Sequence, residues 1–233
     1  MTDWATVEDN LASVLGRIAR AAEAAGRDPA DVGLVAVSKT VPLSRVLEAY
    51  AVGQRCFGEN RVQEAAEKLR AWPAELPRPE WHLIGHLQTN KARLAAELFD
   101  LVHSVDTVRV LGALSRHASA LGRELPVLLE VHLSEEPTKS GFAPEELTGV
   151  IEAAADLPAI RVEGLMTIAP RSATGQAARP YFRRLRELRD ALGERYPDLR
   201  LRHLSMGMTA DFEAAITEGA TLVRLGRAIF GER

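Results

Sequence analysis

Eight short apolar runs alternate with longer segments of helical spacing along this chain. The predicted strands cover residues 33–40, 54–59, 81–85, 101–106, 126–133, 161–168, 200–206 and 221–226. The predicted helices between them cover 43–52, 61–71, 88–98, 107–122, 143–156, 175–193 and 209–218. This alternation indicates a parallel sheet, because parallel neighbours need a crossover connection. Eight units in 233 residues predict a closed (β/α)8 TIM barrel. The alternative is an open doubly wound sheet, although no glycine-rich dinucleotide fingerprint follows the first strand.

An additional helix is predicted ahead of the first strand, over residues 3–25. Its apolar side chains form one stripe made of Val7, Leu11, Val14, Leu15 and Ile18. Gly26 and the pair Asp28-Pro29 then end the helix. Only residues 227–233 follow the eighth strand, too few for a full covering helix. We therefore expect the N-terminal helix, residues 1–25, to cover the barrel wall where the last and first strands meet, within one domain of residues 1–233.

Composition restricts the partners and the compartment of the protein. With 46% hydrophobic residues, the chain can bury one sizeable core. A formal net charge of −3 gives no general attraction to nucleic acid or to an anionic membrane. Cys56 is the only cysteine, which excludes an internal disulfide and a metal cluster built from cysteines. No run reaches the roughly 18 apolar residues of a membrane helix, and no secretory signal is found. We expect a cytoplasmic protein.

Lys39 follows the first predicted strand and is the most informative single residue. Ligands of parallel barrels bind at the carboxyl ends of the strands. The chain has four lysines against 25 arginines, and only Lys39 follows a buried strand. A desolvated lysine has a lowered pKa and can attack a carbonyl carbon to form a Schiff base, which arginine cannot do. Its position alone leaves two interpretations open, a Schiff-base lysine and a lysine that extends to solvent.

The segments after the seventh and eighth strands favour the first interpretation. Ser205, Gly207 and Thr209 offer hydroxyl groups and a close backbone approach, and Gly226 opens the next loop. Phosphate groups of ligands commonly bind after these two strands of a TIM barrel. The alternative is that Thr209 only caps a helix and that the glycines only turn the chain. A phosphate site beside a Schiff-base lysine indicates pyridoxal 5′-phosphate (PLP) or a phosphorylated sugar in a lysine aldolase.

Other polar residues carry weaker signals. His82, His103, His132 and His203 lie inside strand runs and are interpreted as hydrogen-bonded structural residues. No pair has the spacing of a known metal motif, and no serine lies in a hydrolase elbow, so we expect neither a metal nor a catalytic residue. The arginine-rich segment 179–189 is interpreted as solvated helix surface, with an anion or partner site as the alternative.

Seven ordered sequence blocks resemble one known family. They are AVSKT (36–40), FGENRVQE (57–64), WHLIGHLQTNK (81–91), KSGF (139–142), GLMT (164–167), LSMGMTAD (204–211) and VRLGRAIFG (223–231). Over nearly its whole length the chain resembles the pyridoxal phosphate homeostasis proteins of the YggS/PROSC type. These are single-domain relatives of the alanine racemase barrel, with a PLP fold of type III.

The resemblance implies a PLP site with assigned residues. PLP would be held as an internal aldimine on Lys39, with Asn60 near the ring and Arg224 approaching the pyridine nitrogen. The phosphate would be bound by Ser205, Gly207, Thr209 and the Gly226-Arg227 turn. Relatives often carry a small hydroxyl residue at position 227. Arg227 cannot offer that hydroxyl, so the phosphate would be bound there by backbone amides and by the Arg227 guanidinium.

The resemblance also implies binding rather than catalysis. An arginine at the pyridine nitrogen makes the ring a weaker electron sink than a carboxylate partner would. Alanine racemases use a second base, a tyrosine from another domain, which this chain has no room for. We expect a monomer that buffers PLP or delivers it transiently to PLP-dependent apoenzymes, with at most weak side activity. The alternatives are a racemase-like enzyme and a Schiff-base aldolase.

Overall fold

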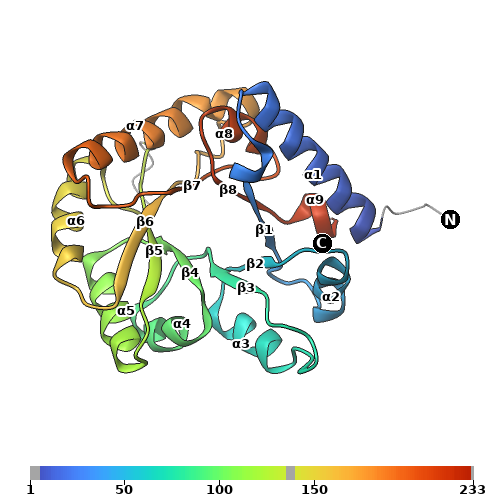
Figure 1. Ribbon diagram of the computed structural model, residues 1–233, viewed down its shortest axis with the longest axis horizontal. Helices are drawn as coiled ribbons and strands as arrows, with labels where there is room; N and C mark the ends of the chain where they lie inside the picture. The colour runs from blue at the N-terminus through green and yellow to red at the C-terminus, as the bar shows by residue number, and fades with distance from the viewer. Residues whose placement is uncertain (1–5, 135–139, 232–233) are drawn as a thin grey trace.

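The eight predicted strands form a closed parallel barrel in the order β1 to β8 (Figure 1). The structure, a computed structural model, describes residues 6–134 and 140–231. Residues 3–5 of the predicted N-terminal helix and Lys139 of the block 139–142 lie outside the described residues. The strands are β1 Gly33–Val37, β2 Cys56–Glu59, β3 Glu80–Leu83, β4 Leu101–Val105, β5 Leu125–Glu130, β6 Ile160–Met166, β7 His203–Ser205 and β8 Leu222–Leu225. β8 pairs with β1, which confirms the barrel and excludes the open sheet.

Helices surround the barrel between successive strands (Figure 1). They are α1 Val7–Ala24, α2 Leu43–Ala51, α3 Val62–Arg70, α4 Ala92–Leu98, α5 Val108–Ala120, α6 Leu147–Ala155, α7 Arg179–Arg195, α8 Phe212–Thr217 and α9 Arg227–Phe230. Short 3-10 turns lie at Pro29–Asp31, Thr89–Lys91, Pro144–Glu146 and Gly175–Ala178. Within the described residues, no helix is both long enough and apolar enough to cross a membrane.

All eight strands are shorter in the structure than predicted, and β7 and β1 lose the most residues, for local reasons. β7 was expected from residue 200, but the backbone N–H groups of Leu201 and Arg202 bond to carbonyls two residues earlier. β1 was expected to continue to residue 40, but the Val41 N–H turns back to the Ser38 carbonyl. Lys39 therefore lies in a turn after the strand rather than in it.

Helix α1 lies outside the barrel beside the seam of β8 and β1 (Figure 1). It packs against α8, α9 and α2 (Figure 1). Its buried stripe consists of Val7, Leu11, Val14, Ile18 and Ala22. The assignment of Leu15 to this stripe was wrong, because Leu15 lies at the stripe's edge and is 47% exposed. Ala22 completes the stripe instead.

Leu11 and Leu15 provide a matched test of this packing. Leu11 is 2% exposed, so Leu11→Ala is expected to lower the free energy of unfolding by about 2–5 kcal/mol. Leu15→Ala removes the same atoms from an exposed site and is expected to change it by less than about 0.5 kcal/mol. Urea unfolding of the two variants measures the difference. Equal stabilities would contradict the covering role of α1.

The arginine-rich segment has a structural role that the sequence interpretation missed. Arg179, Arg183 and Arg186 of α7 all contact the carboxylate of Glu218, which follows α8 and is 2% exposed. The nitrogen–oxygen distances are 2.7, 3.0 and 3.3 Å. The interpretation as solvated surface was therefore incomplete for these three arginines, because a buried carboxylate needs cationic partners. They fasten α7 to the segment after α8.

Candidate functional site

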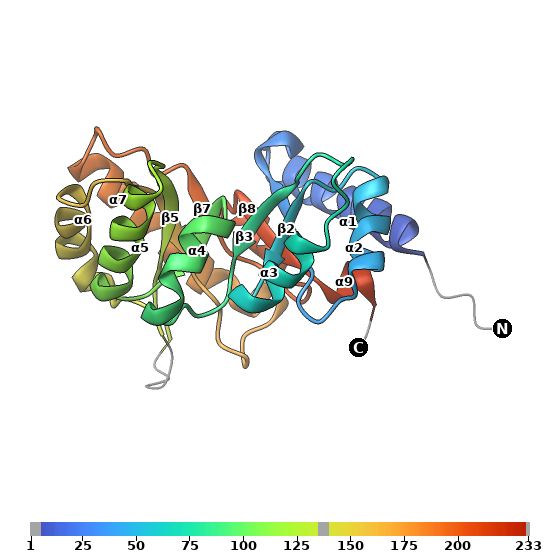
Figure 2. The same ribbon diagram turned by 90° about the horizontal axis from the view of Figure 1, so that it is seen from below.

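A cavity of about 540 Å³ opens at the carboxyl ends of the strands. Figure 2 shows the loop from β6 to α7 projecting from this side of the barrel. The cavity brings together six of the predicted site residues: Lys39, Asn60, Thr209, Arg224, Gly226 and Arg227. Its remaining lining is largely apolar and comprises Val37, Ile84, Ile168, Met208 and Ala210. Ser205 and Gly207 lie close in sequence but are not part of the lining.

A tight turn presents Lys39 to the cavity. Ser38, directly after β1, is fully buried, and its N–H donates to the carbonyl of Gly58 on β2. Thr40 has φ +60, a left-handed backbone that non-glycine residues seldom adopt. The chain thus reverses at Thr40 and leaves the half-buried Lys39 at the cavity wall. Such local strain persists only where surrounding contacts hold the turn.

Those contacts come from a buried charge cluster beneath the turn. The Lys68 ammonium donates to the Ser38 carbonyl at 2.6 Å and to Glu59 Oε1 at 2.6 Å. It also contacts Glu64 Oε1 at 2.9 Å, which accepts the backbone N–H of Thr40. Ser38 Oγ donates to Glu59 Oε1 at 2.7 Å. Lys68 therefore ties β2 and α3 to the turn that carries Lys39.

The buried Glu59 carboxylate of this cluster needs a cationic partner. Burial raises the pKa of Glu59 above its ordinary value, and the hydrogen bond and charge of Lys68 partly oppose that rise. Glu59 is 0% exposed and Lys68 is 7% exposed, so each is the main compensation for the other. Sequence reasoning placed Lys68 only in a helix. The pair Glu64 and Lys68, four residues apart, was the one available signal.

Arg224 of β8 reaches the cavity from inside the barrel. It is 4% exposed, and burial lowers its pKa to about 10. Its Nη1 donates to Ser205 Oγ at 2.5 Å and its Nη2 to the Thr167 carbonyl at 3.0 Å. These bonds fix the plane of the guanidinium and leave further donors of the five for a ligand.

Ser205 and Gly207 support the cavity from behind. Ser205 is 0% exposed, and its hydroxyl contacts Arg224 and His103 Nδ1, the latter at 2.8 Å. Gly207 has φ +92, and a Cβ there would lie 2.6 Å from the Ala215 Cβ. A larger residue would push the loop 207–211 away from α8. The cavity itself meets the next residues of this loop, Met208 to Ala210.

The two loops after β7 and β8 offer polar groups to an anion. Within the described residues, the backbone N–H groups of Thr209, Ala210 and Arg227 donate to no protein acceptor. The Met208 N–H is different, because Asp211 Oδ1 accepts it at 2.6 Å. Arg227 is exposed at the cavity edge and adds a positive charge. Free amides beside two arginines suit a phosphate group.

Asn60 and two apolar side chains complete the cavity. Asn60 follows β2, and Gly85 after β3 packs against it so closely that a Cβ at 85 would lie 2.5 Å from the Asn60 carbonyl oxygen. Ile168 and Met208 are 40% and 39% exposed, unusually high for large apolar residues. Because both line the cavity, a flat ring bound there would cover them.

Comparisons with known proteins identify relatives of this chain. The family model described as "Alanine racemase, N-terminal domain" matches residues 10–233. The protein from Pseudomonas aeruginosa named "Pyridoxal phosphate homeostasis protein" is 50% identical over 228 residues, covering 98% of this chain and 96% of its own.

Two solved structures also resemble this chain. PipY of Synechococcus elongatus with PLP bound has a TM-score of 0.87 and 40% identity, covering 97% of this chain and 100% of its own. Alanine racemase of Clostridium difficile shares the fold alone, with a TM-score of 0.71 and 18% identity over 97% of this chain and 56% of its own. The matches over the full barrel show that the chain belongs to the pyridoxal phosphate homeostasis protein family, whose barrel is that of the alanine racemase N-terminal domain.

Proposed function

We propose that this protein binds PLP as a Schiff base on Lys39 and buffers the cofactor or delivers it to apoenzymes. The observation that carries the proposal is the single cavity shared by Lys39, Arg224 and Arg227. PLP needs an amine for its aldehyde, cations for its phosphate and apolar contact for its ring, and this cavity offers all three. The name of the Pseudomonas aeruginosa relative and the PLP bound to PipY support the same cofactor.

Lys39 is the covalent anchor in this proposal. The unprotonated Lys39 amine attacks the aldehyde carbon, a carbon–nitrogen double bond forms, and the aldehyde oxygen leaves as water. The reaction needs no oxidant and is reversible by hydrolysis. An anchor of this kind keeps a reactive aldehyde away from other amines and can release it again.

The remaining lining residues hold the rest of the cofactor. Thr209, with the amides of the loop that follows β7, and the Gly226-Arg227 turn bind the phosphate. Asn60 lies near the ring, and Ile168 and Met208 cover its faces. Direct phosphate contacts of Ser205 and Gly207 remain a prediction from the sequence, since neither residue is among those that line the cavity.

Arg224 favours storage over catalysis. PLP enzymes stabilise a carbanion best when the pyridine nitrogen is protonated, which a carboxylate partner assists. Arg224 carries only donors and retains its positive charge at neutral pH, with a pKa of about 10. Its position beside the ring nitrogen would therefore disfavour that protonation. The relatives are accordingly named homeostasis proteins rather than enzymes.

Borohydride trapping tests the proposal directly. Purified protein is expected to show the absorbance of a PLP Schiff base, and reduction should convert it to a stable secondary amine. Peptide mapping of the reduced protein should then find the label on Lys39. A label on any residue other than Lys39, or no label at all, would contradict the assignment.

Two alternatives give different results in the same preparation. A racemase-like enzyme would exchange the α-hydrogen of alanine with solvent deuterium at a substantial rate, whereas we expect no more than a trace. A lysine aldolase would carry no yellow chromophore and would be trapped by borohydride only when its sugar phosphate is present.

We also infer that the chain acts as a one-domain cytoplasmic monomer. The closed barrel and its helices bury a core without a partner subunit, which favours the monomer. Contacts with PLP-dependent apoenzymes would then be transient.

A further inference from the structure

Three arginines line a cavity at the amino-terminal end of the barrel, opposite the Lys39 cavity. They are Arg27 after α1, Arg189 in α7 and Arg202 ahead of β7. This arginine cavity has a volume of about 580 Å³. Small residues form much of the rest of its lining, among them Ala30, Gly33, Gly219 and Thr221. A cavity of this kind leaves room for a ligand between the arginines.

The lining of the arginine cavity carries an excess of positive charge. Arginine keeps its charge at any pH that a folded protein meets. Against the three guanidinium groups stands one carboxylate among the described lining residues, that of Asp31. The whole chain has a formal net charge of −3, so this excess is local. Such a concentration of cations attracts an anion.

His203, which also lines the arginine cavity, adds no charge of its own. Burial lowers its pKa although nearby Glu163 opposes the change, so the ring is neutral at neutral pH. Its Nδ1 lies 3.3 Å from Thr221 Oγ1, and its Nε2 lies 3.9 Å from Glu163 Oε2. Glu163 is not among the lining residues, and its other oxygen accepts from Arg161 Nε at 2.6 Å. The excess of positive charge therefore comes from the arginines.

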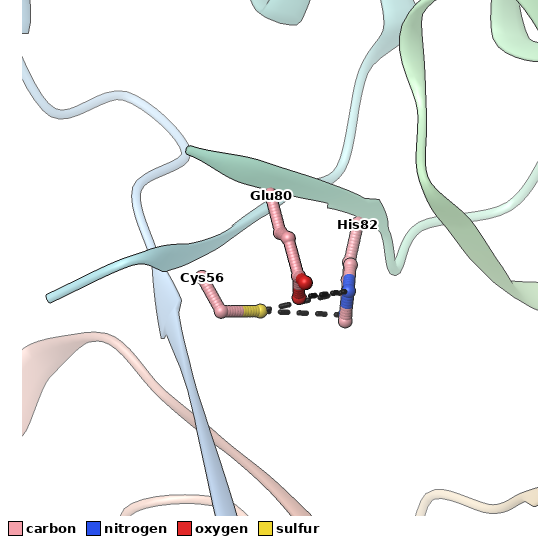
Figure 3. A group of neighbouring side chains, drawn as sticks. All are labelled: Cys56, Glu80 and His82. Carbon is pink, nitrogen blue, oxygen red and sulfur yellow. Dashed lines mark hydrogen bonds and ion pairs between the residues drawn. The ribbon is translucent and has the colours of Figure 1, made fainter. Parts of the chain in front are cut away.

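A second polar cluster at this end of the barrel is separate from the arginine cavity. Cys56, Glu80 and His82 point toward one another (Figure 3). His82 Nε2 lies 3.7 Å from Glu80 Oε2 and 3.6 Å from Cys56 Sγ. None of the three is among the residues that line the arginine cavity. The Glu80 carboxylate is thus engaged by His82 rather than by the three arginines.

Arg27 is fixed in place by backbone acceptors. Its Nη1 donates to the Ile216 carbonyl at 2.9 Å and to the Ala220 carbonyl at 2.8 Å. These two bonds hold the guanidinium at the cavity wall. Within the part of the chain that the structure describes, its Nε and Nη2 have no hydrogen-bond partner. These two nitrogens form one edge of the guanidinium, and such an edge can bind two oxygens of one phosphate.

Arg189 and Arg202 likewise keep donors for a ligand. Arg189 Nε donates to Asp190 Oδ1 at 2.6 Å, which leaves its two Nη groups. Among the described residues, Arg202 has no hydrogen-bond or ion-pair partner. Burial lowers the pKa of Arg27, Asp31 opposes this effect, and the positive charge of Arg189 adds to it. Arg27 and Arg189 therefore repel each other, and an anion bound between them would relieve that repulsion.

We propose that Arg27, Arg189 and Arg202 bind the phosphate group of a small phosphorylated molecule. The planar fork of a guanidinium matches phosphate oxygens, and a phosphate group carries about two negative charges at neutral pH. The volume of about 580 Å³ lies within the usual range for small-molecule sites. Because the cavity lies at the far end of the barrel from Lys39, the site does not depend on the function proposed above. Arg189 belongs to the segment 179–189, for which an anion site was the alternative interpretation.

Calorimetric titration with inorganic pyrophosphate tests the site in the full-length protein. At constant ionic strength, the wild-type protein is expected to bind pyrophosphate. Arg189→Ala and Arg202→Ala should each weaken binding by about 10-fold, the effect of losing a charge-assisted hydrogen bond. Arg200→Ala removes an exposed arginine that does not line the cavity, so it should leave binding unchanged. Equal affinity in wild type and Arg202→Ala would overturn the proposal.

Arg227→Ala distinguishes this site from the Lys39 cavity, which Arg227 lines. Pyrophosphate binding that is lost in Arg227→Ala but persists in Arg189→Ala and Arg202→Ala would place the anion in the Lys39 cavity and contradict the proposal. The opposite pattern would support the arginine cavity, whether or not PLP binds to Lys39. The result therefore stands or fails separately from the proposed function.

Arginine-specific labelling locates the ligand without a variant. Phenylglyoxal modifies accessible guanidinium groups, and peptide mapping reports the extent of modification at each position. Pyrophosphate should slow the modification of Arg189 and Arg202 several-fold and leave that of Arg200 unchanged. Equal protection at all three positions, or no protection at any of them, would refute the site. Because wild-type protein is used, misfolding of a variant cannot imitate the expected result.

Discussion

Lys39→Ala is expected to abolish the Schiff-base absorbance of the protein and to weaken PLP binding by about 100-fold, equal to about 2.7 kcal/mol. The variant loses the only covalent bond to the cofactor but keeps the phosphate contacts and the apolar walls. PLP should therefore still bind weakly as the free aldehyde. Equilibrium dialysis of the two proteins, with the absorbance spectrum of each complex, measures both effects.

Two controls show whether the amine or only the charge of Lys39 matters. Lys39→Arg keeps the positive charge but cannot form a Schiff base, so its spectrum should match that of Lys39→Ala. Lys91→Ala removes a lysine that does not line the cavity and should leave the spectrum unchanged. A normal Schiff-base spectrum in Lys39→Arg would place the anchor on another lysine.

The fold could be predicted from sequence because its signal repeats. Each strand is a short apolar run, each helix has an apolar stripe, and eight repetitions limit the architecture to few choices. Element ends were less predictable, since they depend on single hydrogen bonds such as the Val41 N–H to Ser38 carbonyl bond that ends β1. Leu15 was misplaced for a similar reason. Its side chain lies at the edge of the α1 stripe, where neighbouring helices decide burial.

Sequence reasoning predicted the residues of the site only where they lie at or after the ends of strands. Six predicted residues share the cavity because carboxyl ends of parallel strands converge. The contacts behind the cavity join residues distant in sequence: Lys68 reaches Ser38 across 30 positions, and Ser205 reaches His103 across 102. No local pattern reports such pairs. The same holds for Cys56 and His82, whose approach depends on the register of β2 with β3.

Lys68→Met is expected to destabilise the protein strongly and to impair PLP binding. The variant leaves the Glu59 carboxylate, which is 0% exposed, without its cation, and breaking a buried ion pair costs about 3–5 kcal/mol. It also removes the bond from Lys68 to the Ser38 carbonyl, so the turn that presents Lys39 loses its support. Urea unfolding measures the first effect, and the Schiff-base absorbance at limiting PLP measures the second.

The destabilisation caused by Lys68→Met should grow as the pH rises, because it depends on the ionisation of Glu59. Burial already raises the pKa of Glu59, and removing Lys68 removes an effect that lowers it. A carboxyl whose pKa is raised on folding favours the folded state at low pH, and that advantage disappears as pH rises through the raised value. The destabilisation by Lys68→Met should therefore be smaller near about pH 5 than near about pH 8. Lys91→Met, with no carboxylate contact among the described residues, should show little loss at either pH.

A double variant decides whether the charge pair itself causes the effect. In Glu59→Gln with Lys68→Met, neither buried charge remains, so stability should recover part of the loss and lose most of its pH dependence. The Lys39 turn would still lack its bond from Lys68, so PLP binding should stay impaired. If Lys68→Met were as stable as Lys91→Met at both pH values, the cluster would not hold the turn. If PLP binding recovered together with stability, the turn would depend on charge balance alone rather than on the Lys68 bond to Ser38.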